Sequence, residues 1–367
     1  MSTFGFTEEQ NELRSTAARF LEEKSSSADV RRLMETTEGF DEATWKQIAD
    51  LGWTGMAIPE EYGGVGFGFV ELTVLMEEMG KKLFCAPYFS SVILAANAIL
   101  NSGTEDQKKR LLPGIADGTT RAALAFVEPS GKWEVDSAEV TASGGTITGT
   151  KSYVVDGATA NLLVVSAKSG NGISLYVVDP DADGVTRTPL QTLDMTRKQA
   201  KIGFNNTPAT LLGDEGAGTA ALQKTLEQAA CALSAEMVGG AQACLDMSTT
   251  YAKERYQFGR PIGSFQAIKH KCANMLMEVE MARSAAYYAG WAAAEDPDEL
   301  SLAASLAKAY CSDAFFHAAA ENIQIHGGIG FTWEHDAHLY FRRAKSDEIY
   351  LGDATYHREL VAQKLGV

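Results

Sequence analysis

The stretch ERYQFGRPIGSFQAIKH, residues 254–270, lies between long helical patterns in the last third of the chain. The segment before it, LEQAACALSAEMVGGAQACLDMSTTYAKERY (226–256), is rich in alanine and contains no proline. Two further long helical patterns follow, at residues 264–294 and 299–327. Helices that are this long and this broadly apolar need partners on most of their faces. The sequence therefore predicts a helical bundle that is buried against other subunits.

The N-terminal part of the chain, residues 1–118, also has a helical pattern. Thr7 with Gln10, and Thr104 with Gln107, have the spacing of a capping box, in which the two side chains cap the start of a helix reciprocally. Glycines separate the helical segments between these two caps. We expect a helical domain over these residues.

The middle of the chain has the composition of strands and turns. Short segments such as GTITGTKSYVVDG (145–157) and NLLVVSAK (161–168) are rich in Val, Tyr and Thr, and Gly, Asp and Pro separate them. No long helical pattern interrupts this part. The sequence therefore predicts three domains, which are helical at 1–118, β at 119–218 and helical at 219–367.

The charge and the cysteines exclude several classes of protein. The formal net charge is −16, from 32 basic and 48 acidic side chains, which argues against binding to nucleic acid. No apolar run approaches the roughly 20 residues that a membrane-spanning helix needs. No early lysine-rich segment precedes an apolar run, so we expect no signal peptide. The five cysteines are scattered without a CxxC pair, which favours buried thiols over disulfides or a zinc site. We expect a cytoplasmic protein.

Two kinds of motif could carry chemistry, but simpler interpretations suffice for both. EHDAH places His335 and His338 one helical turn apart without a third ligand, so we interpret them as polar residues on a helix surface and expect no metal. The glycine clusters GGVGFG (63–68) and HGGIG (326–330) do not follow a strand, as a dinucleotide-binding loop does. Each cluster alone is typical of a turn that ends a helix.

Three stretches together resemble the acyl-CoA dehydrogenase family. They are IPEEYGG (58–64), the stretch at 254–270, and QIHGGIGFTWEHDAHLYFRRAK (324–345). The last two are long and specific, and the order of helical, β and helical parts agrees over essentially the whole chain. The resemblance implies an α+β fold with a helical N-terminal domain, a middle β-barrel and a C-terminal four-helix bundle. In the family, this bundle usually forms the core of a tetramer or a dimer.

Members of this family bind FAD and an acyl-CoA thioester, and they act in lipid metabolism and β-oxidation. The resemblance implies that a glutamate removes the α proton while a hydride passes from the β carbon to flavin N5. The thioester carbonyl accepts hydrogen bonds from a ribityl hydroxyl of the flavin and from a backbone N–H, which acidifies the α proton. Electrons then usually leave through an electron-transferring flavoprotein.

The family's cofactor contacts that cross a subunit interface are intact in this chain. Arg255, Gln257 and Phe258 fill the positions that reach the diphosphate and adenine of the neighbouring subunit's FAD. A cation and an amide donor suit phosphate oxygens. The residues that match the turn contacting the adenosine half of FAD are Gln324, Gly327 and Gly328. Glycines let the backbone approach a cofactor closely.

The β domain departs from the family in its flavin-facing segments. The family's TEPxAGSD run, whose hydroxyls contact flavin and CoA, is VEPSGKWEV here, so Val127 replaces a hydroxyl and Ser130 is poorly placed to substitute. In the family's W-I-T/S run, Tyr153 takes the first position and Val155 replaces the hydroxyl. Each lost donor weakens flavin binding by about 1 kcal/mol or more. We expect Tyr153 to contact the flavin in a domain that holds FAD weakly.

The catalytic glutamate of the family is missing. In most members it lies in a Y-E-G-T turn that aligns with residues 350–353, where Leu351 cannot accept a proton. In a minority it lies on the first long C-terminal helix, at about Ala229 in this chain. Glu227 is two residues away, about 200° around that helix. Asp353 is the remaining candidate base, although it is better placed to cap the next helix.

Three hypotheses remain open. In the first, which we favour, this chain is the base-lacking subunit of a heteromeric bacterial acyl-CoA dehydrogenase, like the α2β2 assemblies of steroid side-chain catabolism. In the second, it is a homomeric dehydrogenase whose base is Asp353 or Glu227. In the third, it is a non-redox acyl-CoA-binding paralogue. The small residues Gly239 and Gly240 suggest room for an acyl chain, whose type the sequence does not specify.

Overall fold

The computed structural model describes residues 6–367, and its N-terminal part is helical, as the sequence predicts. Thr7 and Thr104 form the two expected capping boxes with Gln10 and Gln107. The elements of this part are α1 (Glu8–Lys24), α2 (Ser27–Met34), α3 (Glu42–Asp50), η1 (Trp53–Gly55), η2 (Glu60–Tyr62), α4 (Phe69–Lys81), η3 (Phe89–Ala95), α5 (Ala96–Ser102) and α6 (Glu105–Ala116).

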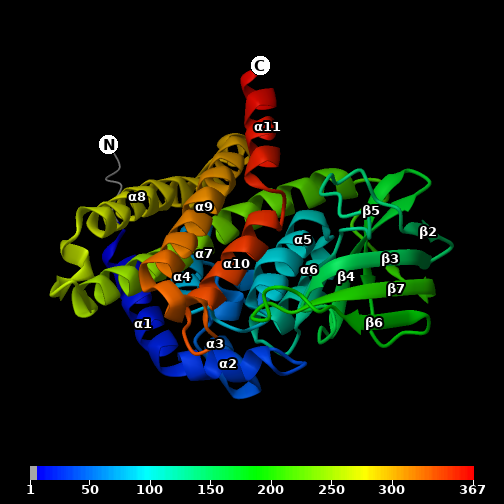
Figure 1. The fold of residues 1–367 in the computed structure, drawn as a ribbon. Helices are drawn as coiled ribbons and strands as arrows, with labels where there is room; N and C mark the ends of the chain where they lie inside the picture. The colour runs from blue at the N-terminus through cyan, green and yellow to red at the C-terminus, as the bar shows by residue number, and fades with distance from the viewer. Residues whose placement is uncertain (1–5) are drawn as a thin grey trace. The chain divides into compact units, whose positions relative to one another are not determined.

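The middle of the chain forms a single sheet. Its strands are β1 (Ala122–Ala125), β2 (Thr141–Ser143), β3 (Thr146–Val155), β4 (Leu162–Ser169), β5 (Gly172–Val178), β6 (Val185–Pro189), β7 (Gln199–Pro208) and β8 (Thr210–Leu212). The strand order is β6-β7-β3-β2-β4-β5-β8, and β1 pairs with β4 in parallel (Figure 1).

This sheet is open, which corrects the expectation of a closed β-barrel. Among residues 6–367, no pairing joins its two edge strands, β6 and β8. Both edges are short, since β6 spans Val185–Pro189 and β8 only Thr210–Leu212. A proline has no N–H to donate to a further strand, so Pro189 limits how far the β6 edge can pair.

The C-terminal part of the chain returns to helices, and its three long helical patterns are all borne out. The helices are α7 (Gly218–Glu254), α8 (Gln266–Glu295), α9 (Pro297–His326), α10 (Ala337–Ile349) and α11 (Ala354–Leu365). Between α7 and α8 lie β9 (Tyr256–Gln257), β10 (Arg260–Pro261) and η4 (Ile262–Ser264), and η5 (Gly327–Phe331) follows α9. None of the helices within the described residues is long and apolar enough to cross a membrane.

The chain divides into two compact units. The first comprises Met1–Arg31, Phe69–Phe84 and Ala230–Val367, and the second comprises Arg32–Gly68 and Cys85–Ala229. Segments from the two ends of the chain therefore belong to one unit, while the sheet lies in the other. The three-domain division at residues 118 and 218 stays a prediction.

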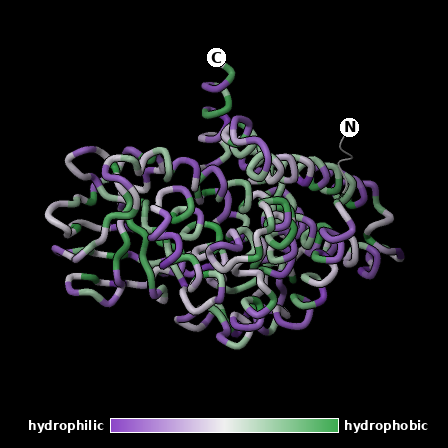
Figure 2. Tube along the Cα trace, turned by 180° about the vertical axis from the view of Figure 1, so that it is seen from behind, coloured by the Kyte–Doolittle hydropathy of each residue, from purple (hydrophilic) through white to green (hydrophobic). Residues whose placement is uncertain are grey.

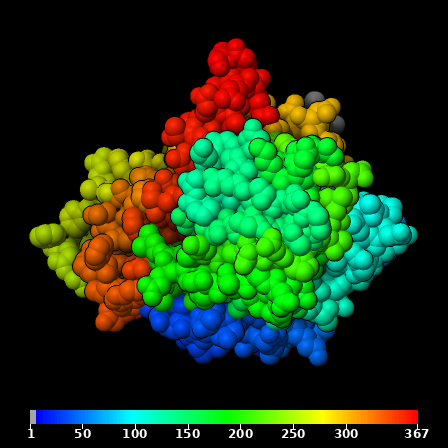
Figure 3. Space-filling view, turned by 90° about the vertical axis from the view of Figure 1, so that its right-hand side faces the viewer, coloured from blue at the N-terminus to red at the C-terminus, as the bar shows by residue number. Residues whose placement is uncertain are grey.

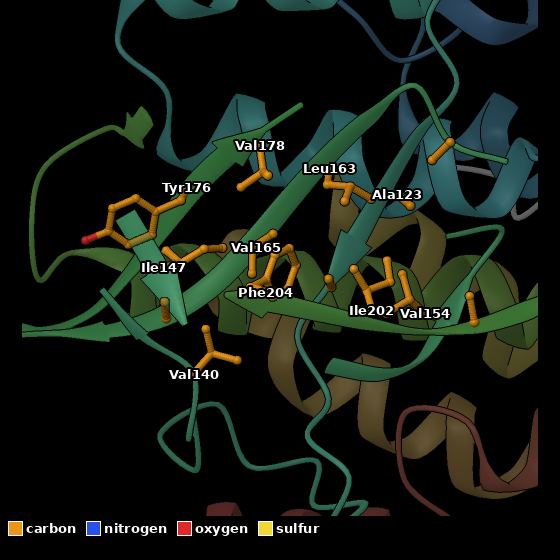
Figure 4. Packing of buried hydrophobic residues seen from close by; sticks show 14 residues of the cluster. Ala123, Val140, Ile147, Val154, Leu163, Val165, Tyr176, Val178, Ile202 and Phe204 are labelled. Atoms are coloured by element: carbon orange, nitrogen blue, oxygen red, sulfur yellow. The ribbon is translucent and has the colours of Figure 1, made fainter. Parts of the chain in front are cut away.

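The core of the second unit lies on the sheet. In Figure 4, Val165 of β4 lies next to Phe204 of β7, and Ile202 of β7 lies beside Val154 of β3. In Figure 2, apolar stretches in the strands of the sheet are joined by polar loops. The strands and the loops between them are coloured teal to green in Figure 3. The buried aliphatic cluster makes the sheet a firm support for the segments that leave its strand ends.

In the first unit, α4 and α7 cross with their backbones in contact. A Cβ added at Gly239 of α7 would stand 1.9 Å from the carbonyl oxygen of Glu77 on α4. A Cβ added at Gly240 would stand 2.3 Å from the ring of Phe315 on α9. The two glycines are therefore close-packing positions with no free space around them. This corrects the interpretation that they leave room for an acyl chain.

Candidate functional site

Leu351 lies in the turn between α10 and α11, the position at which we expect the family's glutamate from the sequence. Leu351 is 5% exposed and has a φ of +65°, a conformation that few non-glycine residues adopt. The amides on either side, of Tyr350 and Gly352, donate to the carbonyls of Ser346 and Ile349. Among the residues that the structure describes, the amide of Leu351 has no acceptor. Since an amide in a buried residue is seldom left unpaired, this donor suits a carbonyl oxygen of a ligand.

Lys308 of α9 holds this turn from inside the protein. Its side chain is fully buried, and its Nζ donates to the carbonyl of Gly352 at 2.8 Å, to the carbonyl of Glu348 at 3.1 Å and to Oγ of Ser312 at 3.1 Å. These bonds use all three donors of the ammonium group. Burial lowers the pKa of Lys308 to about 8, although the charge of Asp347 opposes the shift. Near pH 7 the lysine is therefore still mostly protonated.

His357 of α11 holds the middle of the same turn. Its Nε2 donates to the carbonyl of Leu351 at 2.9 Å, and among the described residues its Nδ1 has no partner. Burial, together with the charge of Lys308, lowers the pKa of His357 to about 4. The histidine is therefore neutral near pH 7. Lys308 and His357 together bind three carbonyls of residues 348–352.

The two candidate bases have local partners. Oδ1 of Asp353 accepts the amide of Tyr356 at 2.8 Å, so Asp353 caps α11, as the sequence predicts. Glu227 lies on α7 and accepts a hydrogen bond from the side chain of Gln223 at 3.0 Å. Ala229, at the alternative position of the family glutamate, is fully buried. The role of either acid as a base stays a prediction.

Arg255, Gln257 and Phe258 lie together at an exposed hairpin. Strands β9 and β10 pair antiparallel, and Phe258 and Gly259 form the two-residue loop with φ values of +54° and +77°. Phe258 is 90% exposed, although its ring meets that of Phe265 edge-on. A phenylalanine this exposed contributes little to packing within its own chain. The hairpin therefore suits contact with another molecule.

Gln324, Gly327 and Gly328 lie at the end of α9 and in η5, and all three are exposed. Gly327 has a φ of +66°, and no heavy atom lies within 4 Å of a Cβ added at either glycine. Tyr251 of α7 stacks on His326 of α9, with ring centroids 4.3 Å apart. This stack brings the end of α7, from which the hairpin starts, next to the end of α9.

These two segments suit the FAD that the resemblance implies. Among residues 6–367, the side chains of Arg255, Gln257 and Gln324 have no hydrogen-bond or ion-pair partner. A guanidinium and two amides are appropriate donors for diphosphate and ribose oxygens. The open space at Gly327 and Gly328 would let a flat ring or a phosphate approach the backbone.

Tyr153 lies at an irregularity between β3 and β7 in the second unit. The pairing register shifts between Lys151 and Val154, and Tyr153 has a φ of +56° with 41% of its surface exposed. Such a bulge turns a side chain out of the regular alternation of a strand. Val127 and Val155, which we expect at the positions of two hydroxyls of the family, are both buried.

A buried ion pair holds both ends of the loop at 129–138. Nζ of Lys151 lies 2.5 Å from Oε1 of Glu128 and 3.0 Å from the carbonyl of Phe126. The same Oε1 accepts the amide of Glu139 at 2.8 Å. Burial lowers the pKa of Lys151, and Glu128 counteracts this effect. The loop at 129–138, where we expect the family's AGSD run, is therefore held to the sheet at its start and at its end.

Three buried residues of these sites were not singled out from the sequence, namely Lys308, His357 and Lys151. Lys308 lies in ASLAKAYCS, where a lone lysine within a small-residue helix is a weak signal of burial. The other two have no local signal, because their partners are distant in the sequence. The interpretation of His338 as a surface residue is wrong. It is 8% exposed, and its ring packs against Trp333 at 4.7 Å.

Comparisons with known proteins match almost the whole chain. Models of the acyl-CoA dehydrogenase N-terminal and C-terminal domains match residues 7–119 and 216–366. Acyl-CoA dehydrogenase IpdE2 of Mycolicibacterium smegmatis is 33% identical over 347 residues, which cover 94% of this chain and 95% of that protein. A solved structure of the Tcur3481-Tcur3483 steroid ACAD has a TM-score of 0.89 at 32% identity, covering 98% of this chain and 99% of that one. The ChsE4-ChsE5 complex from Mycobacterium tuberculosis has a TM-score of 0.90 at 26% identity, covering 100% and 99%.

Proposed function

Since this chain belongs to the acyl-CoA dehydrogenase family of FAD-dependent oxidoreductases, we propose that it is one subunit of a heteromer whose partner chain supplies the catalytic glutamate. The heteromer removes the α and β hydrogens of an acyl-CoA thioester and passes the electrons to an electron-transferring flavoprotein. This proposal rests on one observation: Leu351 is a buried aliphatic residue, and its turn is held by hydrogen bonds from Lys308 and His357.

The chemistry explains why this position matters. Removing the α proton of a thioester needs a general base within hydrogen-bond reach of that proton. The side chain of Leu351 has no lone pair, and the carboxylate of Asp353 caps α11. FAD, when bound, accepts the hydride from the β carbon. This chain therefore contributes a backbone donor to the thioester carbonyl, and the proton acceptor comes from elsewhere.

The cofactor contacts support a site to which two kinds of chain contribute different residues. Arg255, Gln257 and Phe258 reach the neighbouring subunit's FAD from the exposed hairpin. Among residues 6–367, the side chains of Arg255 and Gln257 have no hydrogen-bond or ion-pair partner, and Phe258 is 90% exposed. The end of α9 contacts the adenosine half of that cofactor. The residues that do so are Gln324, Gly327 and Gly328. This chain thus completes a cofactor site that its partner mainly builds.

The chain's own flavin site is weaker. Tyr153 contacts the flavin from the bulge of β3, but Val127 and Val155 offer no hydroxyl to it. A missing hydrogen bond weakens binding by about 1 kcal/mol or more, so two losses lower the affinity by about thirtyfold or more. We therefore expect the lone chain to retain little FAD.

An exposed apolar stripe on α8 supports an oligomer. Its members are Leu276, Met277, Met281 and Trp291, which are 42–64% exposed. Apolar side chains that gather on one helix face usually mark a contact with another chain. The similar ChsE4-ChsE5 structure is a complex, which supports our proposal of a heterotetramer with a related chain here. Five free cysteines are in keeping with a cytoplasmic location.

A homomeric dehydrogenase with Asp353 as base is the second candidate. Oδ2 of Asp353 has no hydrogen-bond partner among the described residues, so one carboxylate oxygen is available to accept a proton. Its side chain is exposed, however, and a base for this reaction works best when water is kept away.

The test compares the lone chain with the chain co-expressed with a related dehydrogenase chain from a neighbouring reading frame. The measurements are the molar ratio of FAD to chain and the anaerobic bleaching of the flavin by acyl-CoA thioesters. We expect the lone chain to be flavin-poor and inactive, and the complex to be flavin-loaded and bleached.

Two results would contradict the heteromer. Full flavin occupancy with turnover by the lone chain would favour the homomer, and Asp353→Asn should then abolish turnover while FAD stays bound. A flavin-loaded complex that no acyl-CoA thioester bleaches would favour a non-redox acyl-CoA-binding paralogue.

A further inference from the structure

The backbone between α10 and α11 is held by one side chain from α9 and one from α11 itself. Lys308 reaches it from α9 and binds the carbonyls of Glu348 and Gly352. His357 reaches it from α11 and binds the carbonyl of Leu351. Both side chains are buried, so neither can contact a substrate directly. Their bonds use three carbonyls of the turn. The amide of Leu351 remains without an acceptor among the described residues.

Packing alone does not explain Lys308. Removing an ammonium from water costs several kcal/mol, and an apolar side chain of the same length would fill the volume without that penalty. The charge is compensated by three well-formed hydrogen bonds, two of which go to the turn. Because Lys308 donates two of its three hydrogen bonds to carbonyls of one turn, its main effect is on the conformation of that turn.

The conformation of Leu351 needs such support. A φ of +65° is unfavourable for a residue with a Cβ, by about 1 kcal/mol or more. A strained residue keeps its conformation only when the surrounding structure holds it. The bond from His357 to the Leu351 carbonyl, together with those from Lys308 on either side, supplies that constraint.

We propose that Lys308 and His357 are positioning residues, which hold the turn at 348–352 so that the amide of Leu351 can donate to the thioester carbonyl of a bound acyl-CoA. This inference rests on the proposed function, because it requires a thioester at the turn. It goes beyond that function because it gives Lys308 and His357, which touch no substrate, the role of fixing the backbone geometry of the turn. The turn then binds the thioester although it cannot remove its proton.

A pH dependence follows from the same geometry. The titratable or charged groups that face Lys308 are Cys311 on α9, Asp347 and Glu348 on α10, Asp353 in the turn, and His357 on α11. Burial raises the pKa of Cys311 to about 12 and lowers that of His357 to about 4, so neither titrates between pH 7 and 9. Lys308, with a pKa of about 8, loses its charge in this range and donates more weakly. Thioester affinity should therefore fall as the pH rises through 8.

The decisive variant is Lys308→Met, which removes the donors with little change in length. Lys345→Met is the matched control, because Lys345 pairs with the side chain of Glu348 at 3.0 Å but bonds to no carbonyl of the turn. Lys308→Gln keeps an amide donor and serves if the methionine variant unfolds. All variants are made in the full chain, in the form that holds FAD, and their thermal unfolding is compared first.

Two measurements are made on each variant. Hydrogen–deuterium exchange is followed in peptides that cover residues 346–358. The dissociation constants of butyryl-, octanoyl- and palmitoyl-CoA are measured between pH 7 and 9. In Lys308→Met we expect faster exchange confined to the turn, about tenfold weaker thioester binding and loss of the pH dependence near 8. Lys345→Met should behave as the wild type, and Lys308→Gln should lie between.

The outcomes separate this inference from the function on which it rests. Equal thioester affinity in the wild type and in Lys308→Met overturns the inference, even if the turn exchanges faster, because Lys308 would then be only structural. An affinity loss of the same size in Lys345→Met also overturns it. A wild-type protein with a protected turn that binds none of the thioesters overturns the proposed function instead.

Discussion

The imidazole of His357 donates a 2.9 Å hydrogen bond to the carbonyl oxygen of Leu351, the residue that we expect at the position of the family's glutamate. The turn around Leu351 is held at several points. Asp353 caps the helix that follows, and Lys308 binds the carbonyls of Glu348 and Gly352. The backbone of the turn is therefore held firmly, although the side chain of Leu351 cannot accept a proton.

This bond makes the turn sensitive to acid. Burial lowers the pKa of His357 to about 4, whereas an exposed histidine in the unfolded chain has a pKa near 6.5. Between these values the unfolded state binds a proton that the folded state does not, so stability is lost as the pH falls from 6.5 to 4. This group should contribute up to about 3 kcal/mol to that loss.

His357→Gln tests the acid sensitivity, because glutamine can donate to the same carbonyl without titrating. Urea unfolding of both proteins at several pH values between 6.5 and 4 gives the slope of stability against pH. The slope should be smaller in the variant. Parallel curves would show that His357 is not responsible.

The crossing of α4 and α7 should not tolerate a methyl group. In Gly239→Ala, the new Cβ would overlap the carbonyl oxygen of Glu77, and backbone atoms cannot move aside as a flexible side chain can. On the other helix, a Cβ added at Gly80 of α4 would stand 2.0 Å from the carbonyl oxygen of Glu236 on α7. Neither helix therefore has room for an added methyl group at the crossing. We expect a loss of about 3 kcal/mol or more in the free energy of unfolding.

Gly170→Ala is the control for this substitution, because no heavy atom lies within 4 Å of a Cβ added at Gly170. Thermal and urea unfolding should leave this control within about 1 kcal/mol of the wild type. A Gly239→Ala protein as stable as the control would contradict the backbone contact.

Replacing only one partner of the ion pair between Lys151 and Glu128 should strongly lower the free energy of unfolding. Lys151→Met leaves a carboxylate that is 1% exposed without its cation, which costs about 3–5 kcal/mol. Adding Glu128→Gln removes the stranded charge, so the double variant should regain much of that stability. A double-mutant cycle by urea unfolding measures the coupling. Additive losses would mean that the pair is not coupled in the folded protein.

Gly328 should matter for the cofactor and not for the fold. No heavy atom of the described residues lies within 4 Å of a Cβ added here, and Gly328 has no positive φ, so Gly328→Val should leave the unfolding temperature nearly unchanged. The added side chain would, however, occupy the space through which FAD approaches the backbone. We expect flavin retention in the assembled protein to fall by about tenfold, whereas Gly170→Val should retain flavin as the wild type does. Equal flavin retention in the two variants would contradict this role.

Leu351→Glu should restore the missing base, because the turn that would carry it is intact. In the flavin-loaded protein, we expect this variant to exchange the α proton of an acyl-CoA with solvent deuterium, and Leu351→Gln to show no such gain. Mass spectrometry of the recovered thioester measures the exchange. An inactive Leu351→Glu protein that still binds FAD and the thioester would show that the turn is not competent.

The sequence by itself determined the order of helical, β and helical parts, the capping boxes at Thr7 and Thr104, and the cap at Asp353. These features depend on residues that are close in the chain, through periodicity, turn residues and side chains that bond to amides three residues away. The family was also accessible from the sequence, because the stretch at 254–270 and its companion at 324–345 are long and specific.

Only the tertiary structure decided how the turn at Leu351 is held, that the sheet is open, and that Gly239 is a packing position. Each of these depends on groups that are far apart in the sequence, such as Lys308 and Gly352 or Gly239 and Glu77. No local pattern of hydropathy distinguishes a lysine on a helix surface from one whose ammonium binds carbonyls in the interior. That distinction arises only when folding brings α9 against the turn and removes water from both.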